Sequence, residues 1–249
     1  MTDSDVTLNI GKVSISYSFL YPETASFFGE YAENERIYEN QFNICISREY
    51  IYENRWLVDE NAQPSPFLEF QCLMLKTGNE ILTHNHALFH GAALMWKGKA
   101  WVFTAPSGTG KTTQLRHWRR ILKRDVRIIN GDKPLLECKE DGNVIVHSSP
   151  WRGKEKFGIK GLNAPLGGII LLEQGKENCI ERMEPKDAVR PLFIEFISFP
   201  ENEAQIRSQA EILDQILDHV PVWKLVNLGD PVSAELTLET IRRYREDQV

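Results

Sequence analysis

The sequence has few cysteines, no long apolar run and no block of positive charge, and each absence excludes a class of protein. Its four cysteines among 249 residues form no C-x-x-C pair, which excludes a zinc ribbon and a thioredoxin-type redox site. No apolar run approaches the ~20 residues that a membrane-spanning helix needs. We therefore expect reduced, unpaired cysteines in a cytoplasmic protein that does not enter a membrane.

The charge balance is acidic, with a formal net charge of -6 and no cluster of lysine and arginine. Such a chain is poorly suited to hold a nucleic-acid backbone by electrostatic attraction, so we expect no nucleic-acid partner. The first residues, MTDSDVTLNIGKVS, lack a basic stretch followed by an apolar one, so we expect no signal peptide. Apolar residues make up 42% of the chain and charged residues 26%, which favours an ordinary soluble globular protein over a disordered or fibrous one.

The first 63 residues are expected to form a small β-rich region of mixed structure. Val6–Ile10 and Val13–Tyr17 alternate apolar and polar residues on either side of a Gly-Lys turn, a pattern that predicts a hairpin. The same rule predicts strands at Phe42–Ile46 and Tyr50–Leu57. No residue in this region indicates a chemical role.

Residues 64–249 alternate predicted strands and helices, which indicates an α/β sheet flanked by helices. A helix is expected to begin at Pro64-Ser65-Pro66 and to bury an apolar face that includes Phe67, Phe70 and Ile81. Asp230 and Pro231 are predicted to open the last helix. The other predicted strands are Ala92–Trp96, Ala100–Thr104, Val126–Asn130, Leu166–Glu173 and Val222–Leu228. The other predicted helices are Gln114–Lys123, 185–198 and 202–220, the last with Ile206, Ala210, Leu213, Leu217 and Val220 on one face.

A glycine-rich loop between a predicted strand and a predicted helix is the strongest functional signal. Residues 105–112 read APSGTGKT, a Walker A phosphate-binding pattern whose first position is alanine instead of glycine. Gly108 and Gly110 permit the backbone angles that turn successive N–H groups toward phosphate oxygens. Lys111 can reach the β- and γ-phosphates, and the Thr112 hydroxyl can bind Mg²⁺. The residues expected to surround the nucleotide phosphates are Ser107, Gly108, Thr109, Gly110, Lys111, Thr112 and Thr113.

A carboxylate is expected beside this loop, at the end of a neighbouring strand. Asp132 follows the apolar strand predicted at Val126–Asn130, so we expect it to hold Mg²⁺ together with Thr112. The alternative is an aspartate that only stabilises a Gly-Asp-Lys-Pro turn. A structural zinc held by His84, His86 and His90 is a further alternative, although no cysteine or carboxylate lies close to them in sequence.

Two further features have a functional and a structural interpretation. His90 lies just before the hairpin that leads to the loop, and a lone histidine there is usually a hydrogen-bonded structural residue. Arg152 and Lys154 lie in a Trp-bearing basic loop and could bind phosphate or an anionic acceptor. The structural alternative for this loop is a solvated charge cluster.

These motifs together resemble the HPr kinase/phosphorylase-like family. The resemblance covers about residues 64–230 and is nearest to small bacterial kinases such as lasso-peptide precursor serine kinases. The loop is also similar to that of phosphoenolpyruvate carboxykinase, a relative by fold with a much longer chain. The matching segments are His90-Gly91, APSGTGKTT with Trp118 after it, INGDKPL at 129–135, SPWRGKE at 149–155 and PLGGIILLEQG at 165–175.

The resemblance implies an α/β P-loop fold of the HPr kinase-like type and an ATP- and Mg²⁺-dependent kinase. Phosphate would pass to a hydroxyl group, a serine in the family, on a peptide or a small molecule. His90 matches the family histidine ahead of the loop, so the catalytic residues implied are Lys111, Asp132 and His90. Gly131 stands where relatives usually carry an additional aspartate, so Gly131→Asp is expected to raise turnover.

The sequence leaves two functional classes open. The second class is a nucleotide-binding regulatory or assembly protein with little or no turnover, which the missing carboxylate at Gly131 favours. The identity of the acceptor, the choice between ATP, GTP and pyrophosphate, and the oligomeric state, a homo-oligomer included, are not determined by the sequence.

Overall fold

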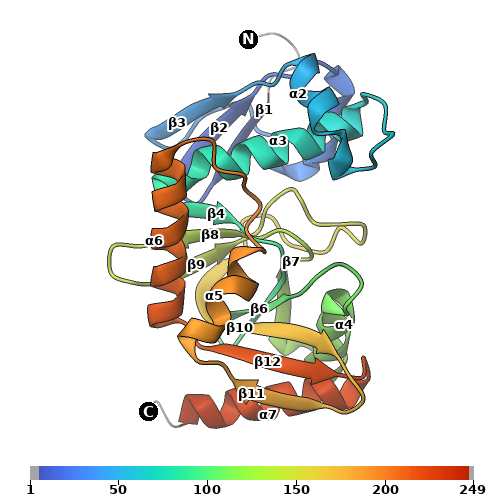
Figure 1. The fold of residues 1–249 in the computed structure, drawn as a ribbon, viewed down its shortest axis with the longest axis vertical. Helices are drawn as coiled ribbons and strands as arrows, with labels where there is room; N and C mark the ends of the chain where they lie inside the picture. Colours follow the sequence, from blue (N-terminus) through green and yellow to red (C-terminus); the bar gives the residue numbers. More distant parts are fainter. Residues whose placement is uncertain (1–5, 247–249) are drawn as a thin grey trace.

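Two β-sheets organise residues 6–246, the part of the chain that the computed structural model describes. A three-stranded sheet lies at the amino-terminal end, and a nine-stranded mixed sheet with helices on both faces forms the rest, so the fold is mixed α/β (Figure 1). Residues 1–5 and 247–249, which belong to the two expected domains, lie outside the described residues. All four cysteines are free, as expected.

The amino-terminal sheet begins with the expected hairpin of β1 (Val6–Ile10) and β2 (Val13–Tyr17). Strand β3 (Asn40–Ile44) pairs with β2 in parallel and lies two residues earlier than expected. The strand expected at Tyr50–Leu57 is wrong, because helix α2 (Arg48–Glu53) and a 3₁₀ turn occupy this segment. The Ser47 side chain caps α2 by accepting a 3.1 Å hydrogen bond from the Tyr50 amide, and this local signal outweighs β-propensity.

Helix α3 (Pro66–Glu80) packs against this sheet and shares its core. The helix begins where expected, with Ser65 as its cap and Pro66 at the first helical position. Phe70 and Ile81 are buried, but Phe67 is 46% exposed, so its predicted place in the core is wrong. The core cluster around α3 continues across residue 64 to side chains of the larger part, including Leu88, Leu135 and Trp151.

The large sheet has the order β4-β8-β9-β10-β6-β5-β7, and β12 and β11 follow on the other edge of β10. All five strands expected in this part are present within two or three residues of their predicted bounds. The strands are β4 (His86–Leu88), β5 (Ala92–Trp96), β6 (Lys99–Thr104), β7 (Val126–Asn130), β8 (Leu135–Cys138), β9 (Val144–His147), β10 (Asn163–Gln174), β11 (Cys179–Arg182) and β12 (Val222–Asn227).

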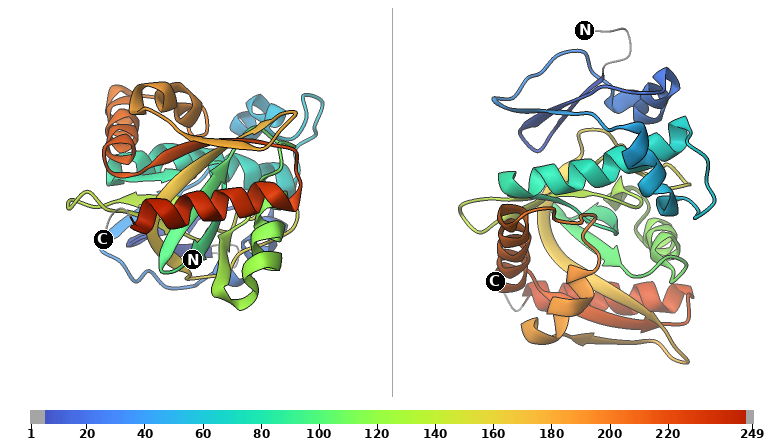
Figure 2. Two further views of the ribbon diagram at one scale, coloured as in Figure 1. Left: turned by 90° about the horizontal axis from the view of Figure 1, so that it is seen from below. Right: turned by 45° about the horizontal axis from the view of Figure 1, so that its top comes forward.

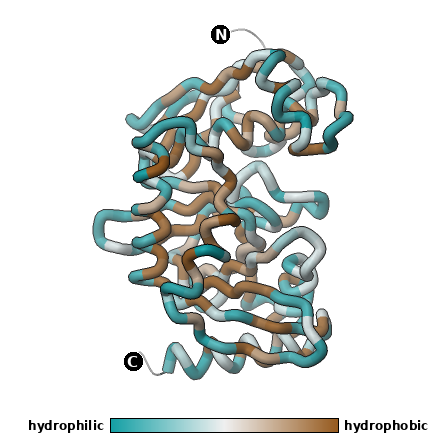
Figure 3. Tube along the Cα trace, in the orientation of Figure 1, coloured by the Kyte–Doolittle hydropathy of each residue, from teal (hydrophilic) through white to brown (hydrophobic). Residues whose placement is uncertain are grey.

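Helices cover both faces of the large sheet (Figure 2). One core layer packs α4 (Lys111–Leu122) and α7 (Pro231–Glu246) on the sheet, and the other packs α5 (Pro185–Phe193) and α6 (Glu203–His219). Figure 3 shows the apolar strands between more hydrophilic outer segments. Among the described residues, no helix has both the length and the apolar character required to cross a bilayer.

The buried face of α6 differs from the expected one. Leu213 and Val220 are buried as predicted, whereas Ile206 is 59% exposed and Ala210 is exposed as well. Ile212 and Ile216 take their place against the sheet. The predicted stripe was therefore rotated, because two polar residues, Gln205 and Gln209, take buried positions in the first half of the helix, where they accept hydrogen bonds from the Glu201 amide and the Ser198 hydroxyl.

The strand directions bring the loop segments of interest to one edge of the large sheet. Strands β6 and β7 both pair antiparallel with β5, so they run in the same direction and end at the same edge. The glycine-rich loop follows β6 and Asp132 follows β7. His90 lies just before β5, which starts at this edge. The fold thus places three segments that are distant in sequence next to one another.

Candidate active site

The glycine-rich loop joins the end of β6 to the start of α4. Its backbone turns at Gly108 and Gly110, whose φ angles of +84° and +115° are those expected for glycine here. Gly110 is the N-cap of α4, so the positive end of this helix dipole faces the loop. Thr109 donates a 2.9 Å hydrogen bond to the Pro106 carbonyl and braces the loop from within.

The Lys111 ammonium group is held inside this loop. Its Nζ donates to the Ala105 carbonyl at 2.6 Å and to the Pro106 carbonyl at 3.4 Å, and the residue is only 8% exposed. Burial lowers the pKa of Lys111, and the nearby charges of Asp132 and Glu195 partly oppose this effect. Those two carboxylates pair directly with Lys133 and His90, so the hydrogen-bond partners of the Lys111 ammonium group are backbone carbonyls.

A tight turn holds Asp132 in place after β7. The Asn130 side-chain oxygen accepts hydrogen bonds from the Asp132 and Lys133 amides, both 2.8 Å long. Asn130 is fully buried and donates in turn to Ser149. One Asp132 oxygen lies 3.6 Å from His90 Nε2, and the other forms an ion pair with Lys133. The carboxylate therefore has a defined position.

A second, buried carboxylate orients His90. Glu195 follows α5, is 4% exposed, and places Oε2 at 2.7 Å from His90 Nδ1. The His90 amide also donates to the Glu195 carbonyl at 2.7 Å, and the Gly91 amide donates to the Asp132 carbonyl at 2.8 Å. Since a carboxylate only accepts, Nδ1 carries the hydrogen, and Nε2 is directed toward Asp132.

Glu195 was not predicted from the sequence. The available signal was a single acidic residue within the otherwise apolar stretch Leu192–Ile197. A carboxylate in such a stretch is either exposed or paired with a partner. Its partner His90 lies 105 residues away, so only the three-dimensional structure identifies the pair.

The loop after Pro150 closes over Asp132. Gly153 has a φ of +72°, and a Cβ atom added there would lie 2.9 Å from the Asp132 Cβ. Lys154 lines the cleft beside the glycine-rich loop. The Arg152 guanidinium instead pairs with Glu30 at 2.6 Å and lies 5.3 Å from the centre of the Tyr31 ring. Arg152 therefore links this loop to the amino-terminal region.

A cleft of about 370 Å³ brings most of the sequence-predicted residues together. Thr109, which braces the loop, is not among the residues that form its wall. Gly131 and Glu155 also contribute to the cleft. The predicted residues that line it are His90, Ser107, Gly108, Gly110, Lys111, Thr112, Thr113, Asp132, Arg152 and Lys154.

Gly131 has no room for the expected additional carboxylate. A Cβ atom at this position would lie 2.9 Å from the Arg152 carbonyl oxygen and 3.0 Å from the Phe157 Cβ. The first of these neighbours is backbone, which cannot move aside without displacing the loop. The expected gain in turnover for Gly131→Asp is therefore replaced by an expected loss of stability.

The donor set in the cleft fits Mg²⁺. Thr112 and Asp132 both line it and offer a hydroxyl and a carboxylate, the oxygen ligands that Mg²⁺ prefers. Residues 6–246 contain no group of three or more His, Cys, Asp or Glu side chains that could hold a metal ion by themselves. A Mg²⁺ ion here would therefore need further oxygens from phosphate or water.

The alternative zinc site is not formed. His86 directs Nε2 to the Gly11 carbonyl, 2.6 Å away, and Nδ1 to the His84 carbonyl. The His90 Nδ1 atom is hydrogen-bonded to the Glu195 carboxylate. The His84 ring stacks on Phe42, so the three histidine rings have separate partners and do not converge on one site.

Comparison with known proteins does not add to this geometry. No protein-family model and no curated protein matches the chain.

Proposed function

We propose that the chain is an ATP- and Mg²⁺-dependent kinase of the HPr kinase-like type that phosphorylates a hydroxyl group of a peptide or small molecule. The observation that carries the proposal is that two functional groups of residues line the same cleft. One is a glycine-rich loop with a buried lysine, which suits nucleotide phosphates. The other is a carboxylate-oriented histidine beside a second carboxylate, which suits removal of a proton.

The loop and the start of α4 would hold the triphosphate. Lys111 would exchange its two carbonyl partners for phosphate oxygens, a stronger, charge-assisted interaction. Thr112 and Asp132 would provide oxygen ligands for Mg²⁺. When bound, Mg²⁺ would reduce the negative charge of the phosphates and favour their transfer.

His90 is the proposed base. Its Nε2 would take the proton from the acceptor hydroxyl, whose oxygen forms a bond to the γ-phosphorus. The bond from that phosphorus to the β,γ-bridging oxygen breaks, and ADP leaves. Glu195 would stabilise the imidazolium that forms, as a carboxylate does in serine hydrolases. Asp132 is less suited to be the base, because it is paired with Lys133 and is a proposed metal ligand.

The second candidate is a nucleotide-binding regulatory protein with little turnover. The Asp132–Lys133 ion pair favours it, because a carboxylate neutralised by an ammonium group is a weaker ligand for a cation. The two candidates agree on nucleotide binding and differ in whether phosphate leaves the nucleotide.

Radiolabelled ATP separates the candidates. The purified chain would be incubated with γ-labelled ATP, Mg²⁺ and a panel of serine peptides and small alcohols. Transfer of label to an acceptor supports the kinase. Tight binding of ATP in calorimetry without transfer or hydrolysis supports the regulator, and absence of binding would refute both.

A further inference from the structure

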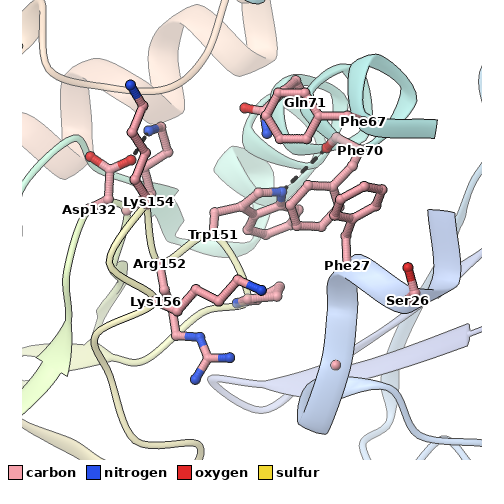
Figure 4. Close-up of a pocket in the computed structure, with 14 residues that line it drawn as sticks. Ser26, Phe27, Phe67, Phe70, Gln71, Asp132, Trp151, Arg152, Lys154 and Lys156 are labelled. Carbon is pink, nitrogen blue, oxygen red and sulfur yellow. Dashed lines mark hydrogen bonds and ion pairs between the residues drawn. The ribbon is translucent and has the colours of Figure 1, made fainter. Parts of the chain in front are cut away.

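A second cavity, of about 480 Å³, adjoins the cleft and shares Asp132, Arg152, Gly153 and Lys154 with it. We call it the aromatic pocket, because Phe27, Phe67, Phe70 and Trp151 line it. Figure 4 shows Asp132 on one side of the pocket, the aromatic rings on the other and basic side chains between them. The pocket thus extends from the proposed reaction centre to the amino-terminal region.

The aromatic wall presents apolar ring surface to the pocket. Phe27 is 39% and Phe67 is 46% exposed, and their ring centres are 5.7 Å apart. Phe70 and Trp151 are buried behind them as a stacked pair with centres 5.7 Å apart. The Trp151 N–H donates to the Phe70 carbonyl, so the wall has no free indole donor. Such a surface suits an aromatic or large apolar group.

The rest of the pocket is cationic, in contrast to the acidic chain as a whole. Four basic residues line it, against Asp132 as its one acidic residue. Lys133 pairs with Asp132 and Arg152 pairs with Glu30. Within residues 6–246 this leaves Lys154 and Lys156 as the unpaired cations of the pocket. Two ammonium groups beside an aromatic wall suit a ligand that is both anionic and apolar.

We propose that the aromatic pocket binds the phosphate acceptor, and that the acceptor is a carboxylate-bearing hydroxyl compound with an aromatic or large apolar group. This inference rests on the proposed function. The hydroxyl would lie at the shared border near Asp132, the apolar group against Phe27 and Phe67, and the carboxylate beside Lys154 and Lys156. Either a serine peptide with aromatic and acidic neighbours or a small aromatic hydroxy acid has this chemistry.

A binding experiment tests the pocket without nucleotide. The probe is 8-anilinonaphthalene-1-sulfonate, an anionic aromatic dye whose fluorescence rises in an apolar site. We expect the double variant F27A/F67A to weaken dye binding about tenfold or more, as loss of two aromatic contacts implies. K154Q/K156Q should weaken it as well. The matched control is Phe199→Ala, a phenylalanine that is 60% exposed and packs on Trp56 outside the pocket.

Equal dye affinity in wild type and F27A/F67A, or an equal loss in Phe199→Ala, would overturn the proposal. Because Phe27 and Phe67 are both partly exposed, the double variant should fold, and circular dichroism would check this. If it does not fold, Phe67→Leu with Phe27→Leu replaces it. That pair keeps apolar volume but removes the ring surface, and a loss of dye affinity is again expected.

A transfer experiment identifies the source of the acceptor. One arm uses short peptides with serine beside phenylalanine and glutamate, or beside alanine and lysine. The other arm uses 3-phenyllactate against lactate. In one of the two arms, we expect the compound with both an aromatic and an acidic group to have a kcat/KM at least about tenfold higher than its comparison compound. The F27A/F67A variant should lose this preference and keep the ATP affinity of the wild type.

The outcomes distinguish this inference from the kinase proposal. Transfer without any aromatic or acidic preference would overturn the inference and leave the kinase intact. Variant-sensitive dye binding without transfer to any acceptor would overturn the kinase, and the pocket would remain a site for an anionic aromatic ligand.

Discussion

At the scale of single residues, the His90 ring lies between two carboxylates whose environments differ. Glu195 is buried and bonded to Nδ1, whereas Asp132 is one-quarter exposed and lies near Nε2. A buried carboxylate on one ring nitrogen fixes the tautomer and orientation of an imidazole, and thereby leaves the other nitrogen available for chemistry. The roles of the two acids therefore differ.

Glu195→Gln is expected to lower kcat for phosphate transfer about 10- to 100-fold and to leave ATP affinity unchanged, because the amide cannot stabilise a charged imidazole. His90→Ala should lower it further, by about 10²- to 10⁴-fold. Initial rates and calorimetry on the same preparations would measure both effects. His117→Ala is the control, since this half-buried histidine lies outside the cleft and its ring hydrogen-bonds to the Gly229 carbonyl. Full transfer activity in His90→Ala would exclude His90 as the base.

Lys111→Ala is expected to weaken ATP binding about 10- to 100-fold, the usual contribution of a charge-assisted hydrogen bond to phosphate. The melting temperature should stay the same or rise, because a buried ammonium group with only carbonyl partners is removed. Calorimetric titration and thermal unfolding would measure these effects. Lys99→Ala at the opposite end of β6 serves as the control. An unchanged ATP affinity would show that the loop is not a nucleotide site.

Glu137 makes the stability of the protein depend on pH. Burial alone would raise its pKa, but hydrogen bonds from His147 and Lys139 outweigh burial and lower the pKa to about 2. A carboxyl group with a lowered folded-state pKa stabilises the protein above its unfolded value of 4.5 and loses this effect as the pH falls toward 2. Wild type should therefore lose about 2 kcal/mol more unfolding free energy than Glu137→Gln between about pH 6 and about pH 3. Urea unfolding at both pH values measures the difference, and parallel losses would contradict it.

At the scale of elements, the loop after Pro150 determines the position of Asp132. Gly153 approaches the Asp132 Cβ so closely that any side chain would displace one of the two. The same loop leaves no space for a side chain at Gly131. The loop is thus a steric support for the carboxylate as well as a carrier of Lys154.

Gly153→Ala is expected to lower the transfer rate about tenfold or more, because displacement of a catalytic group by a fraction of an ångström is costly. Gly161→Ala is a closely matched control. Its φ of +74° is nearly that of Gly153, but no heavy atom lies within 4 Å of the added Cβ. Both variants should lose about 1–2 kcal/mol of stability from the left-handed backbone, and only Gly153→Ala should lose activity. Equal activity in the two would show that the contact with Asp132 is unimportant.

Elements with a strong local signal were predictable from the sequence. Five of the nine strands of the large sheet, the start of α3 and the glycine-rich loop agree with expectation, whereas the short strands β4, β8, β9 and β11 were not predicted. The segment at Tyr50–Leu57 misled because its aromatic residues fit a strand, whereas the Ser47 cap specifies a helix. Glu195 and the crowding at Gly131 were not predictable, since both depend on contacts between segments distant in sequence.

At the scale of the whole molecule, the amino-terminal region and the large sheet share one core. Trp151, from the loop beside Asp132, is buried in the cluster that includes Tyr17, Phe28 and Phe70. Two ion pairs also connect the parts, because Arg152 and Lys160 of the larger part pair with Glu30 and Glu33 of the amino-terminal region. The two parts are therefore joined by apolar as well as charged contacts.

Trp151→Ala is expected to lower the unfolding free energy by about 3–5 kcal/mol, the usual loss for a buried aromatic ring. Amide hydrogen exchange should accelerate in β1, β2 and β3, because these strands belong to the same core as Trp151. They are more than 100 residues away from it in the sequence. Phe199→Ala, at an exposed position, should leave this exchange unchanged. Acceleration confined to the residues around 151 would show that the amino-terminal core is independent.

The shared core also affects the order in which the chain can fold during its synthesis. The amino-terminal strands leave the ribosome before the large sheet does, but two large apolar side chains of their core, Leu135 and Trp151, are added about 120 residues later. At ~5–20 residues per second this delay is on the order of ten seconds. Through that interval the aromatic side chains Tyr17, Phe28 and Phe70 lack two of their core partners, so the amino-terminal core can be completed only after Trp151 has been synthesised.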